Sequence, residues 1–557
     1  MKQFQSWRLK PADEEKVERL EQQLRIHPIL CRILVQRGIE DLETAQRYFR
    51  PQLDHLHDPW LMKDMDKAVA RVMQAIQAGE KILVFGDYDV DGTAAVACMY
   101  QFIRKQHQLT GFYIPNRQRE GYGISKTGID FAHENDYTLI IALDCGIKSV
   151  ELISYAKTLG IGFIICDHHF NGGELPDAVA ILNPKQPGCN YPFKELCGCG
   201  IGYKLIAALT QKMGLPDEEA LEYLDLVAAA TAADIVPMTG ENRTLCYFGL
   251  RKANENPNPG IQALKDLSET QKELQINSLV FMIAPRVNAA GRMDEGKKAV
   301  QLFIADNYHE AYHWARQLEA DNMSRKITDS HTTEEALDII EGDKELMNRK
   351  STVLYRPHWH KGIVGIVASR LIDSYHRPTV VLGQSNGLVT GSARSIPGFN
   401  IYEAIHQCRE LLIGYGGHFY AAGMTLAREQ VDAFCEKFEE VVSASIDPDL
   451  LKPELIYDAE LTFKDITTKF FKLLCQMGPF GPENMRPAFL ARRVYNTGYS
   501  KLVKGEHIRF HLRQNNTNIT GIGFFMPEKM QLVRSKDAMD IVFKIEESDF
   551  NPGRPLQ

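Results

Sequence analysis

The chain has 557 residues, of which 44% are hydrophobic and 24% charged, and its formal net charge is −8. This length exceeds what one hydrophobic core normally serves, so we expect two to four domains in an ordinary soluble protein. The acidic balance argues against nonspecific nucleic-acid binding by the whole surface, although it leaves room for a local basic groove.

The sequence shows no sign of secretion or of a membrane span. Residues 1–16 carry charges throughout and lack the apolar core of a secretory signal. The most apolar stretch, LDLVAAATAADIVPM from Leu224, is interrupted by Asp225 and Asp234 and is too short to cross a bilayer. We therefore expect a cytoplasmic protein without a membrane partner.

The cysteines favour a reducing compartment. There are 11 of them, scattered along the chain, and no CxxC pair occurs. Cys189, Cys197 and Cys199 raise the question of zinc, but no fourth ligand follows at a regular spacing. We do not expect a structural zinc site.

In chain order, the hydrophobic pattern first predicts a largely helical extension over residues 1–80 and then a domain over residues 81–306. From residue 81 to about 237, short apolar runs alternate with helix-length stretches, which predicts a mostly parallel sheet of βα units. The apolar runs are ILVF, GFYI, TLIIALD, GFIICD and AVAILN.

Three further segments follow. Residues 307–350 are polar and almost free of glycine and proline, which predicts one long exposed helix connecting two lobes. Residues 351–445 predict a second α/β unit, with strands at STVLY, PTVVLG and GLVTGSA and a helix near GIVGIVASRLI. Residues 446–557 contain short apolar runs such as HIRFHLR and ITGIGFF separated by turns, which is typical of a small β-barrel.

Acidic and imidazole side chains follow several predicted strands of the first domain. They are, in chain order, Asp87, Asp89, Asp91, Asp144, Asp167, His168 and His169. The carboxyl ends of parallel strands meet at one edge of a sheet, where α/β folds place their ligand crevices. We therefore expect these side chains to converge, even though like charges so close together repel one another.

This combination of ligands indicates divalent cations. Oxygen and imidazole donors without a thiolate suit Mn²⁺ or Mg²⁺, and so many carboxylates overfill one octahedral site, so we expect two ions. Asp234 in TAADIVP, at the end of an apolar helix, adds another candidate ligand. A single aspartate at a strand end is more often a helix cap or a turn residue. Repetition at several strand ends favours the metal site.

The motifs resemble the DHH phosphoesterase superfamily, named for the triplet formed here by Asp167, His168 and His169, and within it the RecJ family of single-strand-specific DNA exonucleases. They are FGDYDVDGTAA, PNRQREGYGIS, ALDCGI, CDHH, TAADIVP, FMIAPRVNAAGRM, WHKGIVGIVASRL, GSARSIPGFNI, GYGGHFYAAGM and MGPFGPENMRPAF. The resemblance covers nearly the whole chain. It implies an α/β fold with two lobes, the DHH and DHH-associated domains, joined by a long helix and followed by an OB-fold β-barrel.

The resemblance also implies roles for individual residues. The metal ligands would be Asp89, Asp91, Asp144, His168 and Asp234. Asp144 would bridge two ions, His169 would face the phosphate, and Asp87 would orient a ligand or a water molecule. The substrate contacts would be Arg117, Arg286, Asn288, Arg292, Ser392, Arg394 and His418.

Within that last group, Ser392 and Arg394 would hold a terminal 5′-phosphate, because an arginine fork suits a phosphate. For His418, a purely structural tight turn is the alternative. We also expect a substrate role for Trp359 and His360. Between Met485 and Arg513, basic and aromatic residues are interleaved, as in a sequence-tolerant single-strand binder, although about half of the aromatics should fill the barrel interior.

The function implied is a single-stranded-DNA-specific 5′-3′ exonuclease that releases 5′-mononucleotides by two-metal phosphodiester hydrolysis, in DNA recombination and repair. A monomer is expected, with a single-stranded-DNA-binding protein and a helicase as partners.

The alternative is a DHH phosphodiesterase acting on short oligonucleotides or cyclic dinucleotides, whose family members lack the basic barrel. A pyrophosphatase would leave the chain's length unexplained. A catalytically silent DNA-binding subunit is disfavoured because every candidate ligand is intact.

Overall fold

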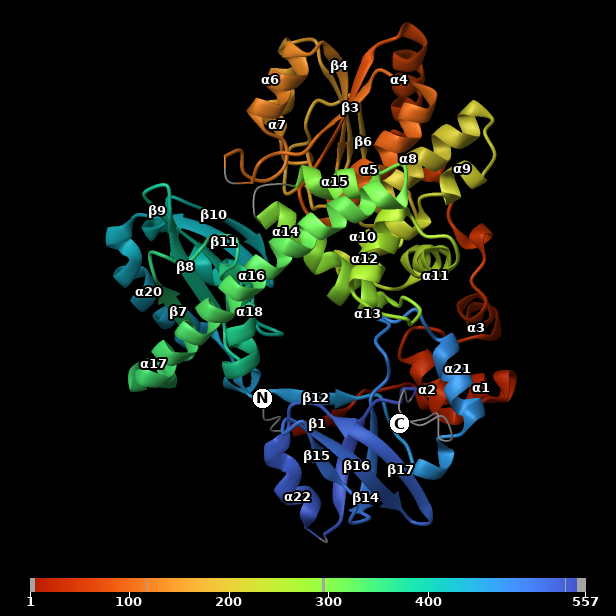
Figure 1. The fold of residues 1–557 in the computed structure, drawn as a ribbon, viewed down its shortest axis with the longest axis vertical. Coiled ribbons are helices and arrows are strands. Elements are labelled where there is room, and N and C mark those ends of the chain that lie inside the picture. The colour runs from red at the N-terminus through yellow and green to blue at the C-terminus, as the bar shows by residue number, and fades with distance from the viewer. Residues whose placement is uncertain (1–5, 118, 293–295, 536, 548–557) are drawn as a thin grey trace. The chain divides into compact units, whose positions relative to one another are not determined.

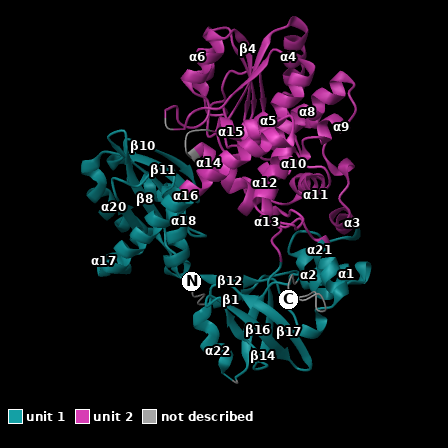
Figure 2. Ribbon diagram, in the orientation of Figure 1, with its two compact units in different colours: residues 1–42, 325–475, 487–557 teal, residues 43–324, 476–486 magenta. Residues whose placement is uncertain are grey.

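The computed structural model describes residues 6–117, 119–292, 296–535 and 537–547, traced in Figure 1. The chain divides into two compact units, which Figure 2 colours separately. Unit 1 comprises residues 1–42, 325–475 and 487–557, and unit 2 comprises residues 43–324 and 476–486. Both units are therefore assembled from segments that are distant in sequence.

Unit 2 is built around a five-stranded sheet with the order β3-β2-β4-β5-β6, in which every neighbouring pair is parallel. Its strands are β2 Lys81–Gly86, β3 Thr110–Tyr113, β4 Tyr137–Leu143, β5 Gly162–Cys166 and β6 Ala180–Leu182. They coincide with the apolar runs of the sequence. The predicted parallel sheet of βα units is confirmed.

Helices cover both faces of this sheet. They are α4 Met65–Ala78, α5 Val90–Gln106, α6 Lys126–Glu134, α7 Val150–Thr158 and α8 Gly198–Met213. Val84 and Ile141 pack on the side of α4, α5 and α8, whereas Phe85 and Ile140 pack on the side of α6 and α7. The strands are continuously apolar because both of their faces are buried.

A second group of helices completes unit 2. It contains α3 Leu42–Phe49, α9 Glu218–Leu221, α10 Leu224–Ala233, α11 Gly240–Glu255, α12 Pro259–Leu267, α13 Ile276–Ser278, the π-helical turn η3 Leu279–Ile283, α14 Ala284–Arg292 and α15 Lys297–Phe303. Every residue from Leu224 to Ala232 in α10 is buried. Apart from Asp225 and Thr231 this helix is apolar on every side, because it lies inside the unit. Among the described residues, no helix is both long and apolar enough to cross a bilayer.

Helix α16, Tyr308–Gly342, is continuous over 35 residues, which confirms the predicted long connecting helix. Its first part belongs to unit 2 and its second part to unit 1. The expectation of an exposed helix is wrong for part of it. Asp329 is completely buried, and its carboxylate accepts a hydrogen bond from Arg370 Nη2 at 2.7 Å. The polar sequence did not predict this burial, because a charged side chain can be buried when it is paired, as Asp329 is with Arg370.

The first sheet of unit 1 has five strands in the order β10-β11-β9-β8-β7. They are β7 Thr352–Tyr355, β8 Thr379–Ser385, β9 Leu388–Arg394, β10 Gly414–His418 and β11 Ala421–Leu426, and the accompanying helices are α17 Lys344–Asn348, α18 Val364–Tyr375, α19 Ile401–His406 and α20 Val431–Ser445. Only β7 and β8 are parallel. The strands at STVLY, PTVVLG and GLVTGSA were predicted. The hairpin formed by GYGGH and AAGMTL was not, because glycine weakens a strand signal.

The C-terminal part of unit 1 contains a six-stranded sheet with the path β13-β14-β16-β15, in which β17 pairs with β16 and β18 pairs with β14. Its elements are β13 Ala459–Glu460, α21 Thr468–Gln476, β14 Phe489–Asn496, β15 Lys501–Val503, β16 His507–Gln514, β17 Thr517–Gly523, α22 Met530–Arg534 and β18 Met539–Phe543. Phe463, Val494 and Leu512 lie in its core. The predicted series of short strands is confirmed.

The N-terminal extension is largely helical as predicted, with α1 Glu14–Leu24 and α2 Pro28–Val35 ahead of α3 and α4. It also contains a strand that the sequence did not predict. Strand β1, Ser6–Leu9, pairs in parallel with β12, Glu454–Tyr457. The pairing joins segments far apart in sequence, so no local pattern announced it.

Candidate metal and phosphate site

The parallel sheet of unit 2 positions a group of acids at the carboxyl ends of its strands. Asp87 follows β2 directly, and Asp89 caps α5 by accepting a hydrogen bond from Gly92 N at 3.0 Å. Asp144 follows β4 in a left-handed conformation with φ 58°. Such a backbone is strained for a residue other than glycine and is found preferentially at functional sites.

His168 stands at the centre of the group. Its Nε2 atom lies 3.3 Å from Asp144 Oδ1, 3.6 Å from Asp234 Oδ2 and 4.0 Å from Asp91 Oδ2. Three sets of side chains bring ligand atoms within 4.8 Å of one another: Asp144 with His168 and His169, Asp91 with His168 and Asp234, and Asp87 with Asp89 and Asp144. The acids and imidazoles predicted from separate strand ends therefore do converge.

The N-terminus of α8 holds two of these acids in place. Gly198 N donates to Asp91 Oδ2 at 2.6 Å, and Cys199 N donates to Asp91 Oδ1 at 2.8 Å. A Cβ atom on Gly198 would lie 2.5 Å from Asp144 Cβ, so only glycine permits this approach. Asp91 thus occupies the position at which a helix N-terminus favours an anion.

Asp167 orients His169. Its Oδ1 atom lies 2.7 Å from His169 Nδ1 and accepts from His169 N at 3.0 Å, while Oδ2 accepts from Ile147 N at 2.9 Å. Burial acts to raise the pKa of Asp167, but its hydrogen bonds to His169 and Ile147 outweigh burial and lower it. Burial likewise acts to lower the pKa of His169, but its bond to Asp167 raises it. Tyr122 Oη lies 3.2 Å from His169 Nε2, the other ring nitrogen.

The remaining acids carry strongly perturbed pKa values. Burial, with repulsion from neighbouring carboxylates, raises the pKa of Asp87, Asp91 and Asp144. The same causes raise the pKa of Asp234 to about 9, and burial lowers that of His168 to about 4. Negative charge is therefore costly here as long as only the chain's own side chains neutralise it.

These residues fit divalent cations. Both carboxylate oxygens of Asp87, Oδ1 of Asp144 and Oδ2 of Asp234 are buried without a hydrogen-bond partner among the described residues. Unsatisfied buried oxygens are expensive, and a cation would both coordinate them and relieve their repulsion. The donors are carboxylate oxygen and imidazole nitrogen, the chemistry suited to Mn²⁺ or Mg²⁺.

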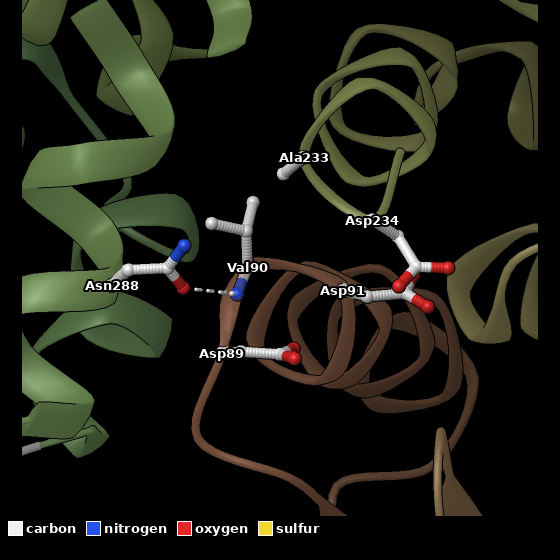
Figure 3. Close-up of a pocket in the computed structure, with 6 residues that line it drawn as sticks. All are labelled: Asp89, Val90, Asp91, Ala233, Asp234 and Asn288. Atoms are coloured by element: carbon white, nitrogen blue, oxygen red, sulfur yellow. Dashed lines mark hydrogen bonds between the residues drawn. The ribbon is translucent and has the colours of Figure 1, made fainter. Parts of the chain in front are cut away.

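A small pocket opens beside these acids. It is lined by Asp89, Val90, Asp91, Ala233, Asp234 and Asn288, which Figure 3 shows from helices α5, α10 and α14. Asn288 Oδ1 accepts from Val90 N at 3.1 Å, so its side chain is fixed at the rim. Arg117 lies 5.1 Å from the centroid of the Tyr88 ring, and its charge partly offsets the rise in the pKa of Asp87.

The other arginines expected in unit 2 are placed differently. The Arg286 guanidinium is paired with Glu319 and donates from Nη1 to Met282 O at 2.5 Å. The structure therefore shows it fastening α14 to α16 rather than joining the acid group. The side chain of Arg292 lies outside the described residues.

Ser392, Arg394 and His418 lie together on one face of the first sheet of unit 1. Arg394 pairs across the sheet with Ala421, and Ala421 pairs with His418, so these residues form one row. Arg394 Nη1 donates to Ser392 Oγ at 2.7 Å. At the N-terminus of α18, a Cβ on Gly365 would lie 2.9 Å from Arg394 Nη2 and 3.0 Å from Ser392 Oγ. A cation, a hydroxyl and a helix N-terminus thus meet at one point, which suits an anion.

The sheet beside this point is uncovered. The next row contains Ser392, Gly423 and Gly416. A Cβ on Gly416 would meet no atom within 4 Å, and one on Gly423 would meet only Gly391 O at 3.9 Å, among the atoms that the structure describes. Polymer backbone can therefore approach the strands closely here.

Trp359 does not support the substrate role expected of it. Its side chain is 1% exposed, and Nε1 donates to Glu335 Oε2 at 2.7 Å, so the ring is part of the core and cannot stack on a base. His360 Nδ1 accepts from Gly362 N at 3.1 Å, a local turn contact. In the described part of the chain, the groups that could hold a metal ion contain no cysteine.

The aromatics of the C-terminal sheet divide between core and surface. Phe489 is buried, and Phe510 packs against the core. Tyr499 is exposed. Arg492 is engaged by Glu460 and Asp540. The surface that remains for a nucleic acid is therefore smaller than the sequence run suggests.

Sequence reasoning missed three contributors. Gly198 and Cys199 hold Asp91, and Tyr122 contacts His169. The glycine-rich start of α8, GCGIG, was a usable signal because such helix starts bind anions. The contact of Tyr122 with His169 depends on the conformation of a loop, which no pattern in the sequence indicates.

Comparison with known families assigns three regions. Residues 81–231 match the DHH family, N-terminal domain, residues 348–444 match the DHHA1 domain, and residues 457–557 match the RecJ OB domain. The chain thus has an α/β fold with DHH and DHHA1 domains followed by an OB domain.

Similar proteins cover the chain almost completely. The single-stranded-DNA-specific exonuclease RecJ of Bacillus subtilis is 35% identical over 98% of this chain and 69% of that protein. The protein of the same name from Salmonella typhimurium is 33% identical over 100% of this chain and 98% of its own length. The crystal structure of Thermus thermophilus RecJ in complex with Mn²⁺ has a TM-score of 0.83 at 26% identity, covering 99% of this chain and 78% of that one. The Mg²⁺ complex has a TM-score of 0.77 at 25% identity, covering 98% and 76%.

Proposed function

Because the chain belongs to the RecJ family, we propose that it is a metal-dependent exonuclease specific for single-stranded DNA, acting from the 5′ end and releasing 5′-mononucleotides. The observation that carries this proposal is the group of acids and imidazoles in unit 2, with its buried carboxylate oxygens unsatisfied. Its ligand chemistry suits phosphodiester hydrolysis assisted by Mn²⁺ or Mg²⁺.

Asp89, Asp91, Asp144, His168 and Asp234 would hold two ions, with Asp144 shared between them. When bound, such ions acidify water and neutralise charge on phosphoryl oxygens. The chain itself supplies orientation. The α8 amides fix Asp91, and Asp167 fixes His169 so that its ring can donate a hydrogen bond to a phosphoryl oxygen. Asp87, buried beside Asp89 and Asp144, would orient a ligand or a water molecule.

Arg117 and Asn288, which lie near the acids, would contact the strand, as would Arg292. In unit 1, Ser392, Arg394 and His418 would hold the 5′-phosphate over the uncovered strip of Gly416 and Gly423. Charge-assisted hydrogen bonds from an arginine are well suited to this anion. The 5′-3′ polarity comes from the family resemblance and not from these residues, because phosphates occur along the whole strand. A cytoplasmic monomer working beside a single-stranded-DNA-binding protein and a helicase, in recombination and repair, completes the proposal.

The test is digestion of an oligonucleotide labelled at its 5′ or 3′ end, with and without Mn²⁺. Wild-type protein should release the 5′ label as a mononucleotide before the 3′ label is lost, and Asp144→Ala should abolish this release. The matched control is Asp177→Ala, an aspartate at the surface that pairs with Lys157. Activity confined to very short oligonucleotides would instead favour the alternative DHH phosphodiesterase. Binding without cleavage at any metal concentration would contradict both.

A further inference from the structure

Two aromatic residues form the tip of the β10–β11 hairpin in unit 1. Phe419 is 40% exposed and Tyr420 is 54% exposed, and their ring centroids lie 4.8 Å apart at an angle of 64°. An isolated apolar side chain at the surface needs no explanation, but two large rings in contact at a loop tip form a small exposed aromatic patch. Loop residues of this kind commonly serve in binding.

The loop is fixed to the strand that carries Arg394. Ser395 N donates to Tyr420 O at 3.0 Å, and Ile401 N donates to Phe419 O at 3.1 Å. Both bonds tie the tip to the segment that directly follows Arg394. The aromatic pair is therefore presented at a fixed place relative to that arginine, which reduces the entropy that binding would cost.

The strand register gives the distance between the two features. His418 begins the loop and shares a row with Arg394, two strand spacings or about 10 Å away. The adjacent row holds Gly416 and Gly423, above which the sheet is open. The row of Arg394, Ala421 and His418 lies between the glycine row and the loop, so a nucleotide whose phosphate lies at Ser392 and Arg394 reaches the loop past Ala421, whose side chain is a single methyl group.

We propose that Phe419 and Tyr420 form a stacking platform for the terminal base of the single-stranded substrate. This inference rests on the proposed function, because Ser392 and Arg394 must hold the 5′-phosphate of the same nucleotide. An aromatic ring stacks on any base, so the platform adds affinity for a 5′-terminal nucleotide without adding sequence preference. It also disfavours a terminus that has lost its base.

The experiment measures equilibrium binding by fluorescence anisotropy in EDTA, which prevents cleavage. Three oligonucleotides are compared: one with a 5′-phosphate, one with a 5′-phosphate on an abasic first nucleotide, and one with a 5′-hydroxyl. The proteins are wild type, the double variant Phe419→Ala/Tyr420→Ala, and Tyr420→Phe, which keeps the ring. The control is Tyr247→Ala on α11, where a tyrosine is 42% exposed and also touches a neighbouring phenylalanine.

For wild type, loss of the terminal base should weaken binding by roughly 5- to 150-fold, the equivalent of stacking one base. The double variant should bind the intact oligonucleotide that much more weakly and should no longer distinguish it from the abasic one. Tyr420→Phe and Tyr247→Ala should retain the distinction. Thermal melting of each variant establishes that the fold is intact.

The platform would be refuted if wild type bound the intact and the abasic oligonucleotides equally. It would also be refuted if loss of the terminal base weakened binding by the double variant as much as it weakens binding by wild type. Failure of the phosphate assignment gives a different result from failure of the platform. In that case wild type would bind the 5′-phosphate and 5′-hydroxyl oligonucleotides equally, whatever the result at the aromatic pair.

Discussion

The α-carbon of Gly198 lies directly against the Asp144 side chain, so that a Cβ on Gly198 would be 2.5 Å from Asp144 Cβ and 2.8 Å from Asp144 Oδ1. The amide of the same glycine donates to Asp91. One residue without a side chain therefore sets the position of two carboxylates on different elements.

The substitution Gly198→Ala should displace Asp144, α8 or both. We expect weaker Mn²⁺ binding in isothermal calorimetry and a loss of about 1–3 kcal/mol in the free energy of unfolding by urea, the usual range for overpacking. Gly200→Ala is the matched control on the same helical turn, because its Cβ would make only ordinary contacts, the nearest at 3.4 Å from Leu196 Cδ2. Wild-type Mn²⁺ affinity in Gly198→Ala would show that the glycine does not position the ligands.

Asp144→Asn should stabilise the metal-free protein while abolishing its response to Mn²⁺. Asp144 is buried, its pKa is raised, and its neighbours repel its charge, so at neutral pH an uncharged amide relieves the folded state. Differential scanning calorimetry in EDTA and in Mn²⁺ measures both effects. Glu439→Gln is the contrast, because hydrogen bonds from Ser351 and Ser443 outweigh burial and lower the pKa of this carboxylate, so its loss should destabilise the protein. A lower melting temperature for Asp144→Asn in EDTA would refute the explanation.

Glu80 should contribute stability that disappears in acid. Its hydrogen bond from Arg71 Nη2, at 2.6 Å, lowers its pKa in the folded protein. The contribution is complete above the unfolded value of about 4.3 and is lost as the pH falls through the lower folded value. Glu80→Gln should therefore be less stable than wild type at pH 7, by about 1 kcal/mol, and the difference should vanish in strong acid. Urea unfolding across that pH range measures the difference in the free energy of unfolding between the two proteins. The same difference at pH 7 and in strong acid would exclude the ion pair as the cause.

Trp359→Phe should reduce stability without changing affinity for single-stranded DNA. The buried indole loses its hydrogen bond to Glu335, which should cost about 1–2 kcal/mol. The control is Trp60→Phe, where the indole donates to Gln211 Oε1 at 2.6 Å but lies at the surface, so water replaces the lost partner. Urea unfolding and anisotropy are the measurements. A specific loss of DNA affinity in Trp359→Phe would restore the substrate role.

The sequence was most informative where chemistry coincided with a local pattern. Asp89 and Asp144 could be placed because each follows a continuously apolar strand, and parallel strands end at a common edge. Asp234 could be placed because an acid at the end of an apolar helix is conspicuous. The role of Asp167 was not predictable, since its bond to a histidine two residues away depends on how the chain turns after β5.

Relationships between distant segments were invisible for a different reason. Trp359 in a motif resembles a ligand-binding ring until its burial is known. The importance of Gly198 depends on its closeness to Asp144, which the sequence does not show. The glycines of β10 weaken the sequence signal of a strand, and only the pairing with β11 identifies the hairpin. In each case the deciding quantity is a tertiary distance, which no window of sequence contains.

The pairing of β1 with β12 bears on how this protein is synthesised. Arg8 and Glu454, which form an ion pair across these strands, are separated by 446 residues. At roughly 5–20 residues per second, a ribosome needs about 20–90 s to make the intervening chain. Throughout that interval the backbone of Ser6–Leu9 has no native partner strand, and its edge is open to other chains. Unit 1 therefore reaches its final form only late in translation, so premature termination before β12 should leave a product vulnerable to proteolysis.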